Sequence, residues 1–201
     1  MLRVGLTGGL ASGKSFVGHA LRDLGCYLIE ADELGHEVLL PDGEAYEAVV
    51  REFGEGILDA QRQIDRKMLG ALVFADPGKL AKLSSLVHPP VGARQARMIA
   101  EIAARDPKAI VVVAAAILVE TGSYKRFDRL IVVTCTLEQQ IERAMKRGPL
   151  TREEVLARLS RQLPLEEKVR LADYVIDTSG AKENTLAQVR TVYGSLRSLS
   201  A

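Results

Sequence analysis

A glycine-rich segment near the start of the chain constrains the fold more than any other feature. Residues 8–15 read GGLASGKS and match the pattern G-x-x-x-x-G-K-[ST]. A short strand-like segment, 3–7, precedes this loop, and a stretch with apolar residues at helical spacing, 14–24, follows it. Strand, glycine loop and helix in this order predict a βα unit whose loop binds phosphate. A merely structural glycine turn is the alternative.

Phosphate binding accounts for the residue types in the loop. Glycines tolerate positive φ and let backbone N–H groups converge on phosphate oxygens. Lys14 would supply a positive charge to the β- and γ-phosphates, and the Ser15 hydroxyl is the predicted Mg²⁺ ligand. The loop therefore predicts a nucleoside-triphosphate site formed by these residues: Gly9, Leu10, Ala11, Ser12, Gly13, Lys14, Ser15 and Phe16.

Strand-like and helix-like segments alternate along the rest of the chain. Further strands are expected at 27–29, 110–113, 129–133 and 174–176. Helices are expected at 32–40, 44–53, 65–74, 77–86, 90–104, 137–146, from 151 onward, and at 182–196. This order predicts an α/β protein with a mainly parallel five-stranded sheet between helices, the three-layer P-loop NTPase fold. Ligands of such sheets bind beyond the carboxyl ends of the strands, so the loops after Thr7, Ile29, Val113, Val133 and Ile176 should form the site.

The chain is expected to form a single P-loop domain over 1–201. The helical stretch between the second and third strands is longer than a crossover needs, which predicts a helical lobe at about 33–105. A basic segment predicts a lid at about 147–165.

Composition excludes several classes of protein. Lys and Arg number 27 against 26 Asp and Glu, a net charge of +1, whereas proteins that coat nucleic acid carry a basic excess. The two cysteines and three histidines form no zinc or disulfide pattern. The longest apolar run, 109–119, is about half of a membrane span, and no leader is recognised. We expect a cytoplasmic protein that binds neither nucleic acid nor membrane.

Three classes of nucleotide-binding protein fit such a loop: small-molecule kinases, GTPase switches, and ATP-driven motors or regulators. No N-K-x-D guanine motif is found, and the strand at 110–113 has no acidic residue after it until Glu120. Elimination therefore favours a kinase.

Asp32 follows the second strand and is a candidate catalytic residue. A kinase that phosphorylates a hydroxyl needs a carboxylate to accept its proton. Asp is also favoured as a helix N-cap, and the local pattern does not choose between the two roles.

Basic residues gather between 143 and 170, where they outnumber the acidic ones. A solvated helix face is the ordinary explanation, but the lid of a kinase also brings arginines to the transferred phosphoryl group. The basic residues are Arg143, Lys146, Arg147, Arg152, Arg158, Arg161, Lys168 and Arg170.

Together these motifs resemble the dephospho-coenzyme A kinase family along nearly the whole chain. The family's L-T-G-G-x-x-S-G-K-[ST] is present in full at 6–15, and its D-A-D corresponds to 30–32. The other matching motifs are His88-Pro89, the L-x-E ending at Glu120, the R-x-x-x-R from Arg143 to Arg147, the lid glutamine Gln162, and A-D-x-V-I-[DN] at 172–177.

The resemblance implies transfer of the γ-phosphoryl group of ATP, with Mg²⁺, to the ribose 3′-hydroxyl of dephospho-coenzyme A. It implies that Asp32 is the base and that Lys14, Arg143 and Arg147 neutralise the transferred group. Asp177 and Gly180 would lie against the adenine of ATP. Acceptor contacts are expected from these residues: Thr7, Asp32, His88, Leu118 and Glu120. His88 alone, before a proline, would more often be a loop or cap residue.

The chain departs from the family pattern at a few positions. Glu30 replaces the first Asp of D-A-D, Ala116 stands within a usual P-L-L, Gly148-Pro149 follows the lid arginine, and Thr178-Ser179 replaces a usual Asn. None removes Asp32, Lys14 or the arginines. The alternatives are a nucleoside- or nucleotide-type kinase of the same fold and a non-catalytic nucleotide-binding regulator. We expect a monomer or a weak homo-oligomer.

Overall fold

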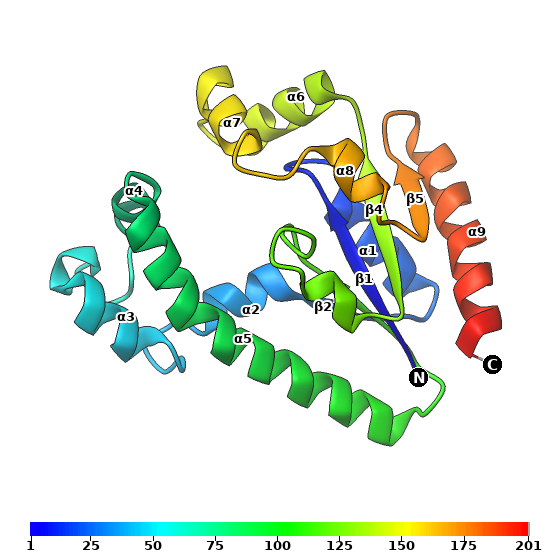
Figure 1. Cartoon of the computed structure of the whole chain (residues 1–201), viewed down its shortest axis with the longest axis horizontal. Coiled ribbons are helices and arrows are strands. Elements are labelled where there is room, and N and C mark those ends of the chain that lie inside the picture. The colour runs from blue at the N-terminus through cyan, green and yellow to red at the C-terminus, as the bar shows by residue number, and fades with distance from the viewer. Residues whose placement is uncertain (201) are drawn as a thin grey trace. The chain divides into compact units, whose positions relative to one another are not determined.

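The computed structural model, which describes residues 1–200, contains a five-stranded parallel β-sheet (Figure 1). Its order is β2-β3-β1-β4-β5, and every neighbouring pair is parallel. The strands are β1 (Leu2–Gly8), β2 (Tyr27–Glu30), β3 (Ile110–Ala114), β4 (Arg129–Thr134) and β5 (Tyr174–Asp177). All five expected strands and the α/β fold class are therefore confirmed.

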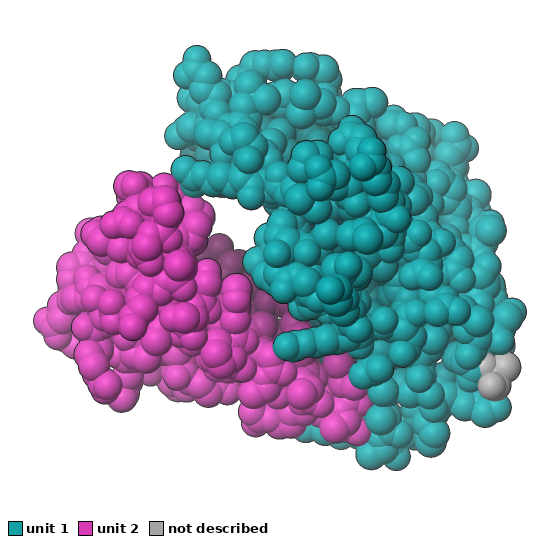
Figure 2. Space-filling model, viewed as in Figure 1, with its two compact units in different colours: residues 1–30, 101–201 teal, residues 31–100 magenta. Residues whose placement is uncertain are grey.

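The described chain divides into two compact units, which Figure 2 colours separately. The first unit contains the sheet and consists of residues 1–30 and the chain from 101 onward. Its helices are α1 (Lys14–Asp23), η2 (Ser123–Arg126), α6 (Leu137–Arg147), α7 (Arg152–Leu159), α8 (Leu165–Val169) and α9 (Lys182–Ser200). The second unit, 31–100, is helical. The expected division into a single P-loop domain with an acceptor-binding lobe (33–105) and a lid (147–165) stays a prediction.

The main core of the first unit lies between the sheet and two helices. Alternate residues of β1 point to the same face because side chains alternate along a strand. On that face Leu6 packs in one cluster with Val17 of α1 and Val189 of α9, and none of these three residues has exposed surface. On the opposite face a Cβ at Gly5 would lie 3.0 Å from Phe127 Cδ2, so this position has no room for a side chain.

The second unit has its own apolar core. Its elements are α2 (Ala31–Glu37), α3 (Tyr46–Phe53), η1 (Glu55–Ile57), α4 (Arg66–Phe74) and α5 (Pro77–Arg105), whose last turn belongs to the first unit. The buried core residues are Val38, Ala45, Val49, Ile57, Ile64, Leu69 and Val73.

The expected break between helices at 77–86 and 90–104 is wrong, because α5 is continuous through Pro89 and Pro90. A proline inside a helix removes one hydrogen bond and clashes with the preceding turn, at a cost of about 3 kcal/mol. Residues on both sides of the prolines, Leu86 and Val91 among them, pack against the same core. This packing holds the helix together where local preference would end it.

The carboxyl-terminal half of the first unit follows the expected pattern closely. Helix α6 ends at Arg147 with Gly148 in an extended conformation, and α7 begins with a capping box in which Thr151 and Glu154 exchange hydrogen bonds.

Among residues 1–200, no helix combines the length and the apolar character that crossing a membrane requires.

Candidate functional site

The phosphate loop lies where the strand order changes direction. From β1 the chain continues to one side of the sheet, to β2 and β3, whereas from β4 it continues to β5 on the other side. Strand β1 ends at Gly8, which pairs with Val133 of β4, and α1 begins at Lys14. Such a switch point leaves a crevice beyond the strand ends that suits a ligand. The predicted arrangement of strand, loop and helix is thus confirmed.

Two glycines of the loop are required by its geometry. Gly13 has φ +93°, and a Cβ there would lie 3.1 Å from the Thr178 side chain. A Cβ at Gly8 would lie 2.7 Å from the backbone oxygen of Val133. The backbone therefore passes too close to its surroundings for any larger residue, as a loop that presents N–H groups to a ligand must.

Side chains from three later segments hold the loop in place. Gln140 Nε2 donates to Leu10 O over 2.9 Å, and the Thr178 hydroxyl donates to Ser12 O over 2.7 Å. Gln162 Oε1 accepts a hydrogen bond of 2.9 Å from Leu10 N. Sequence reasoning missed Gln140 and noted Thr178 only as a departure from the family. Both lie more than 120 residues from the loop, so no local pattern could connect them with it.

The structure brings Arg143 to the same place. Its guanidinium donates to Thr178 Oγ1 over 2.9 Å and to Thr178 O over 2.8 Å, and Thr178 in turn holds the phosphate loop. Arg147, four residues later on α6, is exposed at the end of the helix. Residues at this spacing lie on the same face of a helix, so both arginines can serve one ligand.

The residues present fit a bound nucleotide phosphate. The Ser12 hydroxyl is buried and has no hydrogen-bond partner among the described residues, which is costly unless a ligand supplies one. Lys14 is half-buried at the first position of α1, and Ser15 beside it is exposed. Within residues 1–200 no cluster of three or more His, Cys, Asp or Glu could hold a metal ion.

The loop after β5 uses its own side chains to fix its shape. Asp177 Oδ1 accepts from Ser179 N over 2.9 Å, and Asp177 Oδ2 accepts from Ser179 Oγ over 2.6 Å. Gln139 Nε2 donates to Ser179 O over 2.7 Å. Both carboxylate oxygens of Asp177 are thus engaged within the loop, and Gly180, which follows it, is exposed.

The expected acceptor residues of the first unit are largely buried. Thr7 has no exposed surface and donates to Ala116 O over 3.2 Å, and Leu118 is also buried. Glu120 Oε1 lies 2.6 Å from Lys168 Nζ in an ion pair. Lys168, expected in the exposed basic segment, is instead completely buried. The ordinary reading of this lysine as part of a solvated face is wrong.

Asp32 and His88 both belong to the second unit. Asp32 is the second residue of α2, directly after β2, and it is exposed. The strand β3 lies between β1 and β2, so Asp32 follows a strand one removed from the phosphate loop. His88 is exposed in the interior of α5, so its reading as a loop or cap residue is wrong. Burial, and then Arg66, lower the pKa of His36 in α2, while Asp32 and Glu33 oppose this shift.

Comparison with known proteins identifies the family. The dephospho-CoA kinase family profile matches residues 2–184. A dephospho-CoA kinase of Aquifex aeolicus is 43% identical over 196 residues, which are 98% of each chain. A crystal structure from Thermus thermophilus superposes with a TM-score of 0.80 at 31% identity and 96% coverage of both chains. The dephospho-CoA kinase from Campylobacter jejuni has a TM-score of 0.72 at 25% identity, with 99% of this chain and 98% of that chain covered. Matches that extend over nearly the whole chain, together with a phosphate loop at the switch point of a parallel sheet, mean that this protein belongs to the dephospho-CoA kinase family.

Proposed function

We propose that this protein transfers the γ-phosphoryl group of ATP to the ribose 3′-hydroxyl of dephospho-CoA, giving CoA and ADP. The observation that carries the proposal is the family match over residues 2–184, combined with an intact phosphate loop. The four residues to which we assign the catalytic steps, Asp32, Lys14, Arg143 and Arg147, are all present in the sequence.

The phosphate loop would bind ATP through its backbone. The N–H groups between Gly9 and Phe16 would donate to the phosphate oxygens, with the positive end of α1 behind them. Lys14 would offset the charge on the β- and γ-phosphates. ATP with Mg²⁺ supplies the phosphoryl group and a cation that neutralises developing charge, and the Ser15 hydroxyl would be the protein's ligand to that cation.

Asp32 would act on the acceptor. A carboxylate next to the ribose 3′-hydroxyl orients the attacking oxygen and accepts its proton, a contribution of about 10²–10⁴ to the rate. The exposure of Asp32 in the first turn of α2 leaves its side chain accessible to a ligand.

Arg143 and Arg147 would stabilise the transferred phosphoryl group. Charge spreads over its equatorial oxygens in the transition state, and arginines on one helix face can meet it there. The segment 147–165 would serve as the lid that excludes water. The bonds of Arg143 to Thr178 support this role, because they bring its guanidinium to the residue that holds the loop.

Recognition of the two substrates would involve the remaining residues. His88, Thr7 and Leu118 are proposed acceptor contacts, whereas Glu120, also expected there, is paired with Lys168. The backbone between Asp177 and Gly180 would lie against the adenine of ATP. Thr7 and Leu118 could reach a ligand only if their surroundings move, because both are buried. We further propose that the protein works in the cytoplasm as a monomer or weak homo-oligomer, without nucleic acid or membrane.

The acceptor class is tested by a coupled assay of ADP release with ATP and Mg²⁺. Dephospho-CoA, adenosine and AMP are each titrated as the acceptor, and kcat/KM is compared. Dephospho-CoA should be preferred by about a hundredfold or more, since its larger contact area contributes to transition-state binding. Turnover with AMP or adenosine but not with dephospho-CoA would mean a nucleotide-type kinase. ATP binding without turnover of any acceptor would mean a non-catalytic regulator.

A further inference from the structure

Lys168 is the most deeply buried charged residue of the described chain. It belongs to the short helix α8, and its side chain has no exposed surface. Lysines are almost never fully buried unless a partner compensates their charge. Here Nζ lies 2.6 Å from Glu120 Oε1 and donates to Ala116 O over 3.0 Å.

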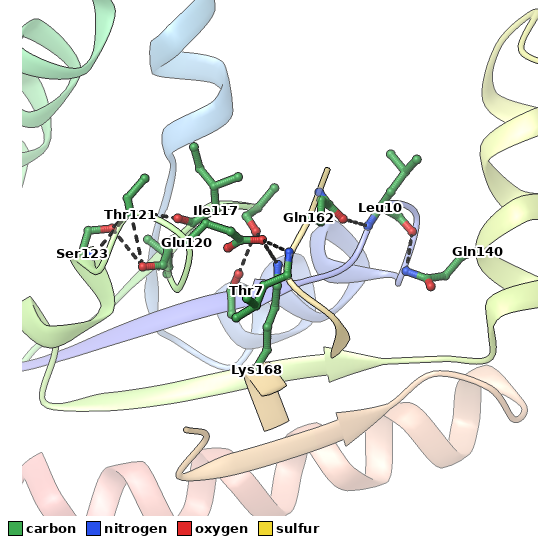
Figure 3. Close-up of polar contacts among 12 residues, drawn as sticks. Thr7, Leu10, Ile117, Glu120, Thr121, Ser123, Gln140, Gln162 and Lys168 are labelled. Atoms are coloured by element: carbon green, nitrogen blue, oxygen red, sulfur yellow. Dashed lines mark hydrogen bonds and ion pairs between the residues drawn. The ribbon is translucent and has the colours of Figure 1, made fainter. Parts of the chain in front are cut away.

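The same two acceptors also bind other parts of the first unit (Figure 3). Glu120 Oε1 accepts from the backbone N–H of Leu163 over 3.1 Å. Ala116 O accepts from the Thr7 hydroxyl over 3.2 Å. The ion pair and these hydrogen bonds together connect four parts of the first unit: the end of β1, the loop after β3, the segment that precedes α8, and α8 itself.

The residue next to Leu163 connects this network to the phosphate loop. Gln162 Oε1 accepts from Leu10 N over 2.9 Å, and Gln140 fixes the oxygen of the same residue, Leu10. Gln162 and Leu163 are consecutive, so fixing the N–H of Leu163 limits where the Gln162 side chain can reach. These two residues lie near the carboxyl end of the expected lid, 147–165.

Stability alone does not account for an ion pair whose lysine side chain is completely buried and whose glutamate side chain is only 19% exposed. Removing two charges from water costs free energy, and well-packed apolar residues of similar size are often at least as stabilising. The Leu163 N–H donates to Glu120, and Lys168 and the Thr7 hydroxyl both donate to Ala116 O. Because hydrogen bonds are directional, these contacts instead define the position of the backbone at 162–163.

We propose that Glu120 and Lys168 are positioning residues that hold the 162–163 segment against the phosphate loop. They act through the Leu163 N–H and the Gln162 side chain on the backbone of Leu10. For catalysis, this inference rests on the proposed function of the loop as the ATP site. It also separates Glu120 from the expected acceptor contacts, because its described partners, Lys168 and the Leu163 N–H, are groups of the protein itself.

The test compares Glu120→Gln with the unchanged protein by amide hydrogen exchange, without any substrate, and by steady-state kinetics. Exchange at Leu10 and Leu163 should become about tenfold faster or more, because their hydrogen-bond partners are displaced. The kcat/KM for ATP should fall by about tenfold or more through misplacement of the loop, while KM for dephospho-CoA stays within about twofold. The exchange measurement stands even if dephospho-CoA is not the acceptor, so failure of the proposed function and failure of this inference are distinguishable.

Matched variants control for charge and folding. Glu142→Gln makes the identical change in an ion pair with Lys146 of the same length, 2.6 Å, but with both side chains more than 60% exposed, and should leave exchange and kinetics unchanged. Lys168→Arg keeps the charge and the donors and should recover more of the kcat/KM for ATP than Lys168→Met does.

The double variant Glu120→Leu/Lys168→Met separates positioning from stability. It removes both charges of the ion pair and should unfold near the denaturant midpoint of the unchanged protein. Under the proposal, exchange at Leu10 and Leu163 stays fast and kcat/KM for ATP stays low. Recovery of both to the original values would overturn it, as would a Glu120→Gln variant that raises only KM for dephospho-CoA and leaves exchange unaltered.

Discussion

Asp32 is the single residue on which the proposed chemistry depends most. Asp32→Asn keeps the size of the side chain but removes its ability to accept a proton. The kcat for dephospho-CoA should fall by about 10² or more, with ATP affinity nearly unchanged, as expected for loss of a general base. Steady-state kinetics and calorimetric titration of ATP measure the two effects. Glu33→Gln, at the next position of the same helix turn, serves as the control. A near-normal kcat in Asp32→Asn would return Asp32 to a role at the helix terminus.

Gly13 allows a second test within the phosphate loop. Gly13→Ala places a Cβ at φ +93° and 3.1 Å from Thr178, so the free energy of unfolding should fall by about 1–2 kcal/mol and ATP affinity should drop. Gly92→Ala changes a glycine inside α5 with nothing within 4 Å of the new Cβ. It should raise the free energy of unfolding by up to about 1 kcal/mol. Urea denaturation measures the free energy of unfolding of both variants. Equal effects would mean that the loop conformation imposes no strain.

Cys26 should be unreactive in the folded protein. Burial raises the pKa of its thiol to about 12, so almost no thiolate is present at pH 8, and the thiolate is the reactive form. Titration of Cys135→Ser with a chromogenic disulfide reagent should show no rapid reaction in buffer and one reactive thiol in denaturant. Rapid labelling of the native variant would contradict the burial of Cys26.

Lys168 shows where sequence reasoning fails at the residue scale. Its position in a run of basic residues indicated a solvated or lid-facing side chain, but its partner Glu120 is distant in sequence. A local charge pattern cannot reveal a pairing that only the fold creates. The residues of the phosphate loop, by contrast, were predictable because strand, loop and helix are continuous in the chain.

At the scale of elements, the strands were predictable and α5 was not. Runs such as 110–113 are β-branched on both faces, which is typical of a strand buried within a parallel sheet. Proline pairs normally end helices, so the pattern around Pro89 indicated two helices. Tertiary packing of both halves on one core overrides that preference, and such packing leaves no local signal.

The continuity of α5 can be tested directly. Pro90→Ala restores a backbone donor inside the helix, so the free energy of unfolding should rise by about 2 kcal/mol, after allowance for the lower entropy of the unfolded proline chain. Pro77→Ala is the matched control, because Pro77 is the first residue of α5, where proline is tolerated. The free energy of unfolding, measured with a denaturant, should therefore rise clearly in Pro90→Ala and change little in Pro77→Ala. No gain from Pro90→Ala would mean that the helix is interrupted there.

For the whole molecule, net charge describes this protein less well than the distribution of its charges. The sum of +1 argued against binding of a large polyanion, but it did not indicate where positive charge would be used. In the structure Arg143 is directed to the residue that holds the phosphate loop, and Lys168 is internal. Fold class and loop position followed from the order of elements, whereas the side chains that support the loop required the three-dimensional structure.

The central claim is that the protein phosphorylates dephospho-CoA at the ribose 3′-hydroxyl. The most direct measurement is ³¹P NMR of the complete reaction with ATP, Mg²⁺ and dephospho-CoA, combined with mass spectrometry of the product. The account predicts one new phosphomonoester on the 3′ oxygen, a product that matches authentic CoA, and one ADP for each CoA formed. ADP released without CoA, or phosphate attached at another position, would contradict it.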